Sequence, residues 1–379
     1  MDFRLSEESR IILRELKHFC EAEIRPQALH NDENQFFPRE IFTHLGKLGF
    51  LGVIFPSQYG GAGLNYVHYV GIIEEIARAD AAVGLSVAAH ISLCSNHIFE
   101  FGTEAQKRRY LVPLAQGKAI GSWSLTEPTA GSDAGGTRTT ARRDGKHWIL
   151  NGTKTFATHG GVCDFAVVFA VTDPQSKHRR ISAFILEKGM KGFRSGKKEN
   201  KLGCRASDTS EIVMEDCRVP AGNLLGNPGD GFSNALHILD GGRISIASLA
   251  LGILRACLEE SLDYSRKREQ FGKTIASFQA IQWFLADMGT ELEAARLLTY
   301  RAAHLKDLGN QVTRESCMAK LFASESAVRA ANWAVQIHGG YGYIKEYPVE
   351  RFYRDAKICT IGEGTSEIQR MVIARQILG

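Results

Sequence analysis

The chain has 379 residues, of which 44% are hydrophobic and 23% are charged, so it is ordinary globular material long enough for two or three domains. Its formal charge of +4 is spread over mixed-sign clusters, which gives no reason to expect a nucleic-acid or anionic-membrane surface. Eight scattered cysteines without a C-x-x-C pair predict free thiols in a reducing compartment, and they favour neither a bound metal nor a disulfide framework.

The beginning of the chain carries no sign of a targeting segment. Its first eight residues, MDFRLSEE, have neither a basic stretch nor an apolar core, and no run of about 20 uninterrupted apolar residues occurs anywhere. We therefore expect no secretion signal and no membrane insertion. The expected location is the cytoplasm of a bacterium or archaeon, or the mitochondrial matrix for a mature organellar form.

Residues 1–119 are predicted to form an N-terminal all-helical domain. Apolar residues recur at three- to four-residue spacing from Ile11, Ser6 suits an N-cap, and Pro26 is expected to end the first helix. Further helices are expected from Phe37-Pro38 onward, over 66–79, and over 81–100 with a stop at Gly102.

Residues 120–229 are predicted to form a central β domain, a barrel or a sandwich. Short β-rich runs cover 164–172, 181–187 and 211–216, and turn clusters separate them. Asp144-Gly145 and Asn151-Gly152 are each hairpin signals, because these residues tolerate the positive φ of tight two-residue turns. We therefore expect a hairpin at each pair.

Residues 230–379 are predicted to return to helix and to form a C-terminal four-helix bundle. Apolar residues keep helical spacing from Ile246 to Cys257, from Ile281 to Leu305 and from Cys317 to Ile337. Three long helices and one shorter terminal helix are expected. The fold class is therefore α+β and multidomain, in the order helices, β domain, helical bundle.

The segment from Ser124 to Gly136, SLTEPTAGSDAGG, is the first that suggests chemistry. It is rich in small residues and hydroxyl groups and follows a predicted strand. Such a loop can approach a flat cofactor closely and donate backbone N–H groups to carbonyl or phosphate oxygens. Its alternative interpretation is a plain Gly/Ser loop.

The segment from Gln336 to Tyr343, QIHGGYGY, is the second. Glycines after a long helix let a ligand lie against the backbone, although a simple glycine C-cap explains them too. Neither segment is a strand-turn-helix G-x-G-x-x-G, so a Rossmann nicotinamide site is not predicted.

Two stretches each resemble one of the signature patterns of the acyl-CoA dehydrogenase family: the first runs from Ser124 to Gly136, and the second from Gln336 through Glu346 and Arg351 to Asp355. The other matches, in the family's order, are the segments 268–272 (REQFG), 278–281 (FQAI) and 363–370 (EGTSEIQR). The resemblance covers essentially the whole chain and includes the family's helix, sheet, helix layout.

The resemblance implies FAD bound non-covalently between the β domain and the C-terminal bundle, with a neighbouring subunit completing the site. Near the flavin and the pyrophosphate it places Leu125, Thr126, Ser132, Phe156 and Thr158, with Thr365 and Glu367 reaching from the C-terminal segment. For the adenosine diphosphate half it places Arg268, Phe271, Gln279, Gln336, Gly339 and Gly340 across the subunit interface. A guanidinium suits phosphate, although a plain surface charge is the alternative for Arg268.

Glu363, between Gly362 and Gly364, is the candidate catalytic residue. Removing a proton α to a thioester carbonyl needs a base over that carbon and fixed donors for the developing enolate oxygen. Glycine neighbours let substrate approach and leave backbone N–H groups available. A glutamate in a glycine turn is usually only solvated; the resemblance implies the catalytic base instead.

The resemblance also provides an internal check on the base. Some relatives place their base on a helix, at the position of Gly242, and glycine cannot act as a base. Glu363 is then the remaining candidate, as in the short- and medium-chain type. Substrate contacts are implied for Ser132, Asp240, Arg243 and Gly364, with an intrahelical Asp240–Arg243 ion pair as the alternative.

The implied activity is FAD-dependent α,β-dehydrogenation of an acyl-CoA to a trans-2-enoyl-CoA, as in the β-oxidation of fatty acids. The β-hydrogen leaves as hydride to the flavin, electrons pass to an electron-transfer flavoprotein, and the protein is expected to be a homotetramer. Alternatives are an acyl-CoA oxidase or flavin monooxygenase on the same fold, a silent scaffold, and a DNA-binding flavoprotein. The last would carry a basic C-terminal extension, which we do not expect here.

Three positions depart from the family pattern. Phe156 stands where many relatives have tryptophan, His159 where they have asparagine, and Gly362 where a bulky residue, often tyrosine, is common. The first two are expected to alter the flavin's surroundings, with a plain hydrogen-bonded histidine as the alternative for His159. Gly362 is expected to enlarge the pocket for a branched or cyclic acyl group.

Overall fold

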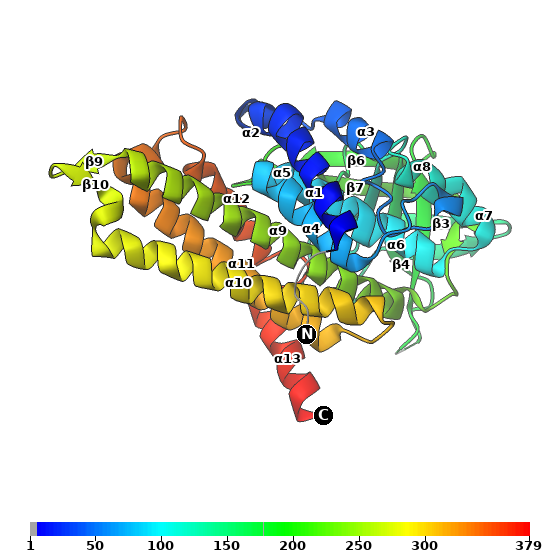
Figure 1. The fold of residues 1–379 in the computed structure, drawn as a ribbon. Helices are drawn as coiled ribbons and strands as arrows, with labels where there is room; N and C mark the ends of the chain where they lie inside the picture. The colour runs from blue at the N-terminus through cyan, green and yellow to red at the C-terminus, as the bar shows by residue number, and fades with distance from the viewer. Residues whose placement is uncertain (1–5, 177) are drawn as a thin grey trace.

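The computed structural model describes residues 6–176 and 178–379, and it arranges them as two helical parts around a β-sheet (Figure 1). Residues 1–5, on which part of the expectation about a targeting segment rests, lie outside the described residues. The predicted order of helices, β domain and helices is confirmed. The predicted domain boundaries fall in the links between elements, before β1 and before α9.

The N-terminal part is helical, as predicted. Its helices are α1 (Glu7–Phe19), α2 (Ala28–Asn34), α3 (Arg39–Lys47), α4 (Tyr66–Ala79), α5 (Ala81–Ala88), α6 (Asn96–Phe101), α7 (Glu104–Gln106) and α8 (Val112–Ala115). Ser6 caps α1 by accepting from Ser9 N at 3.1 Å. The prediction that the helix ends at Pro26 is wrong, since the chain continues through a π-helical turn and a 3-10 turn into α2. Proline is tolerated here because it lies in the first turn of the 3-10 segment, where a backbone N–H would have no partner within the helix.

Within residues 6–176 and 178–379, two helical stretches are long and apolar enough to cross a membrane by length and composition alone. They are 81–101, which joins α5 to α6 through the π-helix Ala89–Ser95, and α9 (Gly231–Lys267). In each, 89% of the apolar window is buried inside the protein. Both stretches therefore have the character of core helices.

The middle part is one sheet of eight strands in the order β6-β7-β3-β2-β4-β5-β8, with β1 pairing in parallel with β4. The strands are β1 (Gly121–Ser124), β2 (Thr140–Asp144), β3 (His147–Thr158), β4 (Phe165–Val171), β5 (Ile181–Glu187), β6 (Phe193–Lys198), β7 (Thr209–Pro220) and β8 (Leu224–Leu225). A separate small hairpin joins β9 (Glu269–Gln270) to β10 (Lys273–Thr274). Apolar side chains of the central strands are buried on both faces of the sheet.

One of the two predicted hairpins is present. Asp144 pairs with His147 across a two-residue turn whose Gly145 has φ +54°. The hairpin at Asn151-Gly152 is wrong, because both residues lie inside β3 at a shift of register against β7. Gly152, with φ +149°, is needed there for close approach: a Cβ would lie 2.5 Å from Thr139 Oγ1.

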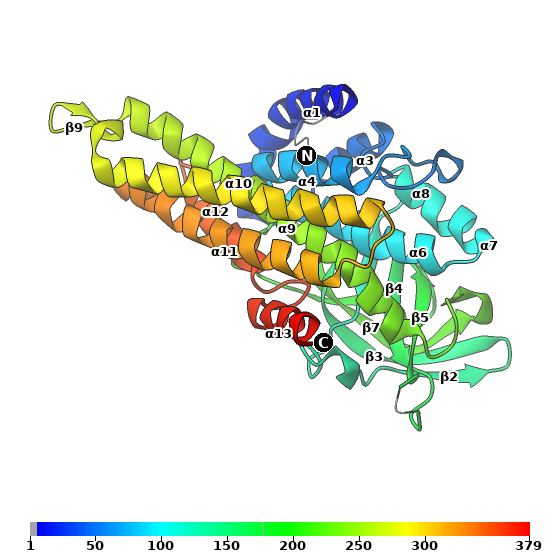
Figure 2. The ribbon, with the colours of Figure 1, turned by 60° about the horizontal axis from the view of Figure 1, so that its bottom comes forward.

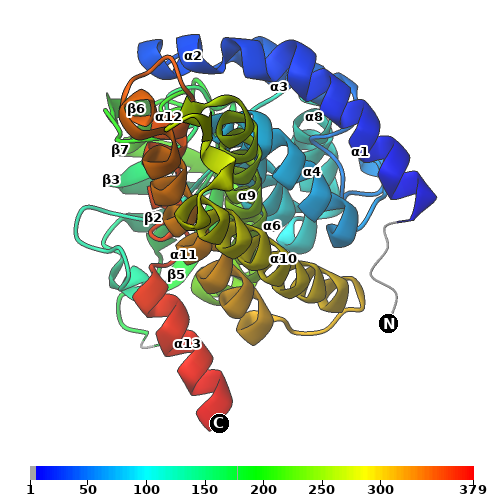
Figure 3. The ribbon, with the colours of Figure 1, turned by 60° about the vertical axis from the view of Figure 1, so that its left-hand side comes forward.

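The C-terminal part contains the three predicted long helices, α9 (Gly231–Lys267), α10 (Gln279–Asp307) and α11 (Thr313–His338). The prediction of a single short terminal helix is wrong, because two helices follow α11: α12 (Val349–Cys359) and α13 (Ser366–Leu378). The chain reverses between them at Glu363 and Gly364, which both have positive φ. Figure 3 shows α13 standing away from the bundle, with the C-terminus at its tip.

Helix α9 connects the three parts of the molecule. It contacts α10, α11 and α12 in the bundle, α4, α5 and the π-helical segment Ala89–Ser95 in the N-terminal part, and strand β5. Figure 2 shows its first half lying over the sheet and its second half running out with α10 and α11. The first half of α9 therefore lies where all three parts come close together.

Candidate active site

The loop between α12 and α13 carries Glu363 in an uncommon backbone conformation. Glu363 has φ +55°, a region that costs a residue with a Cβ about 1–3 kcal/mol, and Gly364 follows with φ +98°. Such strain persists only where neighbouring groups hold it. The carbonyl oxygen of Gly364 accepts from Lys320 Nζ at 2.6 Å and from Gln369 Nε2 at 2.9 Å.

The carboxylate of Glu363 lies directly over Gly242 of α9. A Cβ built at Gly242 would overlap Oε2 of Glu363 and would lie 3.0 Å from Cδ2 of Leu93. The space taken by Glu363 is therefore the space that a side chain at position 242 would need. This geometry gives a steric reason why a chain carries a base at one of the two positions and a glycine at the other.

Burial changes the acidity of Glu363. Its Oε2 is enclosed and has no hydrogen-bond partner among the described residues. This burial raises the pKa of the carboxyl to about 7, while the nearby charges of Lys320 and Arg243 act in the opposite direction. A carboxylate without a partner and with a pKa near neutrality has the properties of a general base.

Asp240 and Arg243 form the intrahelical ion pair that was the alternative to a substrate role. Arg243 Nη1 lies 2.6 Å from Asp240 Oδ1, both side chains are buried, and Thr313 Oγ1 donates to the other carboxylate oxygen at 2.6 Å. Arg243 Nε nevertheless has no partner among the described residues. The pair holds one guanidinium near Glu363, and contact with substrate stays a prediction for both residues.

The loop that follows β1 is held by a buried ion pair. Lys154 Nζ lies 2.7 Å from Glu127 Oε1 and donates to Leu125 O at 3.1 Å, and both charged side chains are buried. Glu127 also accepts from the backbone N–H groups of Arg138 and Thr139. These contacts fix both ends of the loop, which a close fit to a rigid ligand requires.

The structure brings the predicted flavin residues of this loop beside the end of β3. Thr155 N donates to Thr126 O at 2.9 Å, and Ser122 Oγ donates to Thr158 O at 2.7 Å. Phe156 projects from the strand with 66% of its surface exposed and with φ +55°. Leu125 is buried, Thr126 and Thr158 are half-buried, and Ser132 is exposed on the loop.

The residues of this region fit FAD. The hydroxyl oxygens of Ser124, Thr155 and Ser366 are buried without a hydrogen-bond partner among the described residues, so donors and acceptors are left for a ligand. A Cβ at Gly131 would meet nothing within 4 Å, so the backbone of the loop is open there. Hydroxyl groups, free backbone and an exposed aromatic ring suit a flat heterocycle with polar edges.

His159 adopts the hydrogen-bonded alternative. It is fully buried, its Nδ1 lies 2.9 Å from Gly121 O, and its ring packs edge-on against Phe37 and Phe42. Burial lowers its pKa to about 4, so it is neutral at physiological pH. Gly362 is only half-buried, and a Cβ there would meet Ile358 O at 3.5 Å, so a side chain at this position has room.

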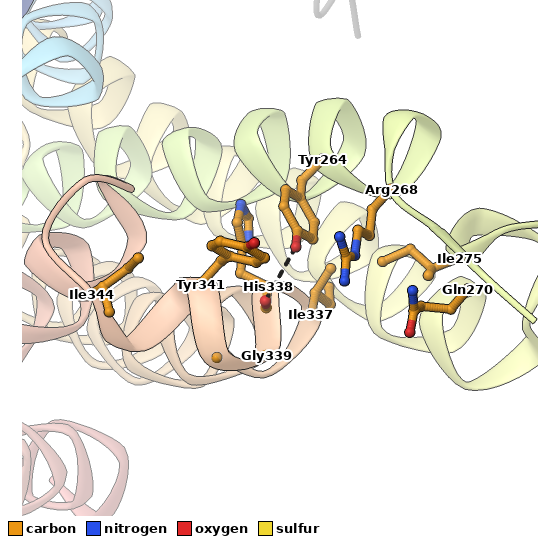
Figure 4. Close-up of a pocket in the computed structure, with 10 residues that line it drawn as sticks. Tyr264, Arg268, Gln270, Ile275, Ile337, His338, Gly339, Tyr341 and Ile344 are labelled. Carbon is orange, nitrogen blue, oxygen red and sulfur yellow. Dashed lines mark hydrogen bonds between the residues drawn. The ribbon is translucent and has the colours of Figure 1, made fainter.

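A second cluster of predicted cofactor residues lies at the far end of the bundle. Arg268, Gly339 and Gly340 line a pocket of about 480 Å³ together with Tyr264, Gln270, Ile275, Ile337, His338, Tyr341 and Ile344 (Figure 4). The Arg268 guanidinium lies 5.4 Å from the ring centre of Tyr341. Phe271, Gln279 and Gln336 are exposed and are not part of the pocket lining.

The two clusters are far apart in one chain. Gly242 lies on α9 and Arg268, 26 residues later, directly follows the end of that helix, which puts them about 39 Å apart at about 1.5 Å per residue. Thr365 and Glu367 lie nearer to Glu363, at the start of α13, where they line a shallow pocket with residues of α11 and α12. Among the residues from 6 to 176 and from 178 onward, no cluster of His, Cys, Asp or Glu could hold a metal ion.

Several structurally important site residues were not found from the sequence. Lys320 and Gln369 support the Glu363 loop, and Lys154 with Glu127 supports the loop after β1. A lysine within a helix or strand gives no signal of burial by itself, since most are solvated. The small residues around Lys320, in the run AKLFASESA, were the one available hint of close packing.

Family models for acyl-CoA dehydrogenases match nearly the whole chain. The N-terminal domain model covers residues 6–118, the middle domain model 122–217 and the C-terminal domain model 229–378. A short-chain specific acyl-CoA dehydrogenase of Clostridium acetobutylicum is 47% identical over 377 residues, which is 100% of both chains.

Solved structures agree with this result. The butyryl-CoA dehydrogenase of Megasphaera elsdenii superposes with a TM-score of 0.98 at 45% identity and covers 100% of both chains. A chain from a structure of the electron transferring flavoprotein of Acidaminococcus fermentans superposes with a TM-score of 0.99 at 46% identity, again over 100% of both chains.

Proposed function

The chain belongs to the acyl-CoA dehydrogenase family, and from that premise we propose that Glu363 is the base that removes the α-proton of an acyl-CoA thioester. The observation that carries the proposal is the position of its carboxylate. Its Oε2 is enclosed over Gly242 of α9, close to Leu93 of the N-terminal part, and has no hydrogen-bond partner among the described residues. Glycine at 242 leaves no second base at the alternative position.

The loop also offers donors for the charge that develops on the substrate. The backbone N–H groups of Glu363 and Gly364 donate to no acceptor among the described residues. As the α-proton moves to the carboxylate of Glu363, negative charge grows on the thioester oxygen, and a fixed N–H donor beside it stabilises that charge. Base and donor on one short loop keep their relative geometry through the reaction.

FAD, when bound, supplies the acceptor for the β-hydrogen, so that the acyl-CoA becomes a trans-2-enoyl-CoA. The residues proposed to hold its flavin half are Leu125, Thr126, Ser132, Phe156, Thr158, Thr365 and Glu367. For its adenosine diphosphate half they are Arg268, Phe271, Gln279, Gln336, Gly339 and Gly340 of a neighbouring subunit, since one chain cannot bring both clusters to one dinucleotide. Ser132, Asp240, Arg243 and Gly364 are proposed to contact the substrate.

The proposed redox partner is an electron-transfer flavoprotein, and the proposed assembly is a homotetramer. The similarity to a chain from an electron transferring flavoprotein structure and to a short-chain specific enzyme supports the partner and a short acyl chain in fatty-acid oxidation. The bacterial origin of these proteins favours the cytoplasm over the mitochondrial matrix.

Proton abstraction can be measured apart from dehydrogenation. With an acyl-CoA whose β-carbon bears no hydrogen, only exchange of the α-hydrogen with D₂O can occur, and NMR follows it. Glu363→Gln should slow exchange by at least about 100-fold, because general-base contributions are about 10²- to 10⁴-fold. Glu215→Gln, an exposed change on β7, is the control. Exchange at the wild-type rate in Glu363→Gln would show that another group is the base.

A further inference from the structure

The backbone around Glu363 is tied on its carbonyl side. Lys320 Nζ donates to Gly364 O at 2.6 Å, and Gln369 Nε2 donates to Gly364 O at 2.9 Å and to Glu363 O at 3.2 Å. The N–H groups of Glu363 and Gly364 have no acceptor among the described residues. A peptide held by its oxygen presents its own N–H in a fixed direction, so the bond from Gln369 to Glu363 O orients the N–H of Gly364. The two bonds to Gly364 O hold the next peptide and so anchor the turn that carries it.

Lys320 is an unusual residue to find here. Its side chain is fully buried in α11, and Gly364 O is its hydrogen-bond acceptor among the described residues. Burying an ammonium group with a single neutral acceptor is costly in free energy, so a role for Lys320 beyond packing is a reasonable hypothesis. The charged and titratable groups that face it are Glu363 on the loop, Arg243 on α9, Cys317 on α11 and Cys359 on α12.

Gln369, on α13, packs against the same turn. It is fully buried on α13, and a Cβ at Gly364 would lie 2.7 Å from its Nε2. A side chain at 364 would displace this amide from its hydrogen bonds, and the φ of +98° at Gly364 also favours glycine. Together the two donors hold a backbone that is strained at Glu363, and without them the two peptides on either side of Gly364 lose the hydrogen bonds to their oxygens.

We propose that Lys320 and Gln369 are positioning residues for Glu363: by holding the carbonyl groups of Glu363 and Gly364 they fix the turn, so that its carboxylate is aimed at the substrate α-carbon and the Gly364 N–H at the thioester oxygen. Lys320 also places a positive charge beside the carboxylate. This inference rests on the proposed role of Glu363 as the base, and it adds two residues that do not touch the reacting atoms.

Lys320 and Gln369 should have separable effects. Lys320→Met removes a donor and a charge at similar length, so both the orientation of the loop and the acidity of Glu363 change. Without the cation the carboxylate holds its proton to higher pH. Gln369→Leu removes a neutral donor, so it disturbs orientation but leaves the charge balance as it was.

The test uses FAD-loaded enzymes of matched flavin content and the α-hydrogen exchange assay, with kcat, KM and pH profiles for a short acyl-CoA. Lys320→Met should lose about 10- to 100-fold in exchange rate and in kcat with KM changed less than about threefold, and the acid limb of its pH profile should move up. Gln369→Leu should lose about 10-fold with the limb unmoved. Arg370→Met, which breaks the exposed Glu325–Arg370 pair between the same two helices, should stay within about twofold of wild type.

Three outcomes overturn the inference. The first is an exchange rate in Lys320→Met within twofold of wild type. The second is a slowed Lys320→Met whose acid limb stays where it is in the wild type. The third is an equal loss of exchange rate in Arg370→Met, which would mean that any loosening of α13 has the effect. If Lys320→Met does not fold, Gln369→Leu decides: a 10-fold loss supports the inference and a wild-type rate refutes it. Glu363→Gln separates the two proposals, since slow exchange there with normal exchange in both other variants refutes the positioning role alone.

Discussion

Burial is the property of Glu363 that sets the pH range of the enzyme. The base acts in its deprotonated form, and burial raises the pKa of this carboxyl to about 7. Below that pH the folded enzyme carries a protonated, inactive Glu363. We therefore expect kcat/KM to fall about tenfold per pH unit as the pH drops below 7, and to level off above it. Steady-state rates between pH 5 and 9 measure this, and a limb near pH 4.5 would mean that the carboxylate is solvated in the free enzyme.

Because a side chain at 242 and the carboxylate of 363 compete for one space, the base should be transferable between them. Gly242→Ala alone should lower kcat/KM about 100-fold, since displacing a catalytic group by about 1 Å has an effect of that size. Gly242→Glu with Glu363→Gly should recover part of the activity that Glu363→Gly loses. Gly289→Ala, where a Cβ meets nothing within 4 Å, is the control. No recovery in the double variant would show that the two carboxylates reach different points.

Among single residues, the sequence identified the candidate catalytic residue better than the residues that hold it in place. Glu363 and its flanking glycines stand in a recognisable motif, and the structure shows the burial that a base needs. Lys320 and Gln369 could not be found in the same way. Gln369 stands in the matched segment 363–370, but its contact with Gly364 O is seen only in the structure. Lys320 meets the same oxygen from 44 residues away along the chain. Contacts of that kind follow from tertiary packing and leave no local pattern.

The bulge at Gly152 in β3 shifts the register of β3 against β7 and brings β3 close to Thr139, which precedes β2. Gly152 approaches Thr139 so closely that a Cβ would lie 2.5 Å from Oγ1 and 2.8 Å from Cα. Gly152→Ala should therefore lower the free energy of unfolding by about 1–3 kcal/mol, as overpacked buried sites do. Urea unfolding of matched FAD-loaded samples measures it. Gly222→Ala, which adds a Cβ in open space, should change stability by less than about 0.5 kcal/mol, and an equal effect of the two would refute the bulge argument.

Element by element, strong periodicity predicted well and turn residues predicted less well. The limits of α4 agree with the predicted 66–79, and β5 agrees with the predicted 181–187. Asn-Gly and proline signals are ambiguous by nature. Asn151-Gly152 supplies a bulge where Asp144-Gly145 supplies a turn, and Pro26 sits in a continuing helical segment. The same local conformation serves several purposes, and the packing around it decides which.

At the scale of the whole molecule, α9 explains both the order of the domains and the division of the site. Its first turn meets strand β5, Gly242 farther along meets Glu363 and the N-terminal part, and its end reaches the pocket of Arg268 about 39 Å from Gly242. A resemblance over the whole chain could predict this layout because it fixes the sequence of elements. The resemblance could not predict which charged side chains, such as Lys320 and Arg243, lie near Glu363.

The separation of the two clusters predicts that active sites are shared between subunits. Glu363→Gln should inactivate the site that contains it, and Arg268→Glu should weaken the site of the partner, because it replaces the cation at the phosphate pocket. Subunits carrying one change each should complement when mixed by co-expression. A mixed dimer then has one site with both groups intact and one with neither, so random pairing restores about a quarter of wild-type activity per subunit. Turnover of differently tagged, co-purified variants measures this. Activity no higher than that of the separate variants would place both groups in the site of a single chain.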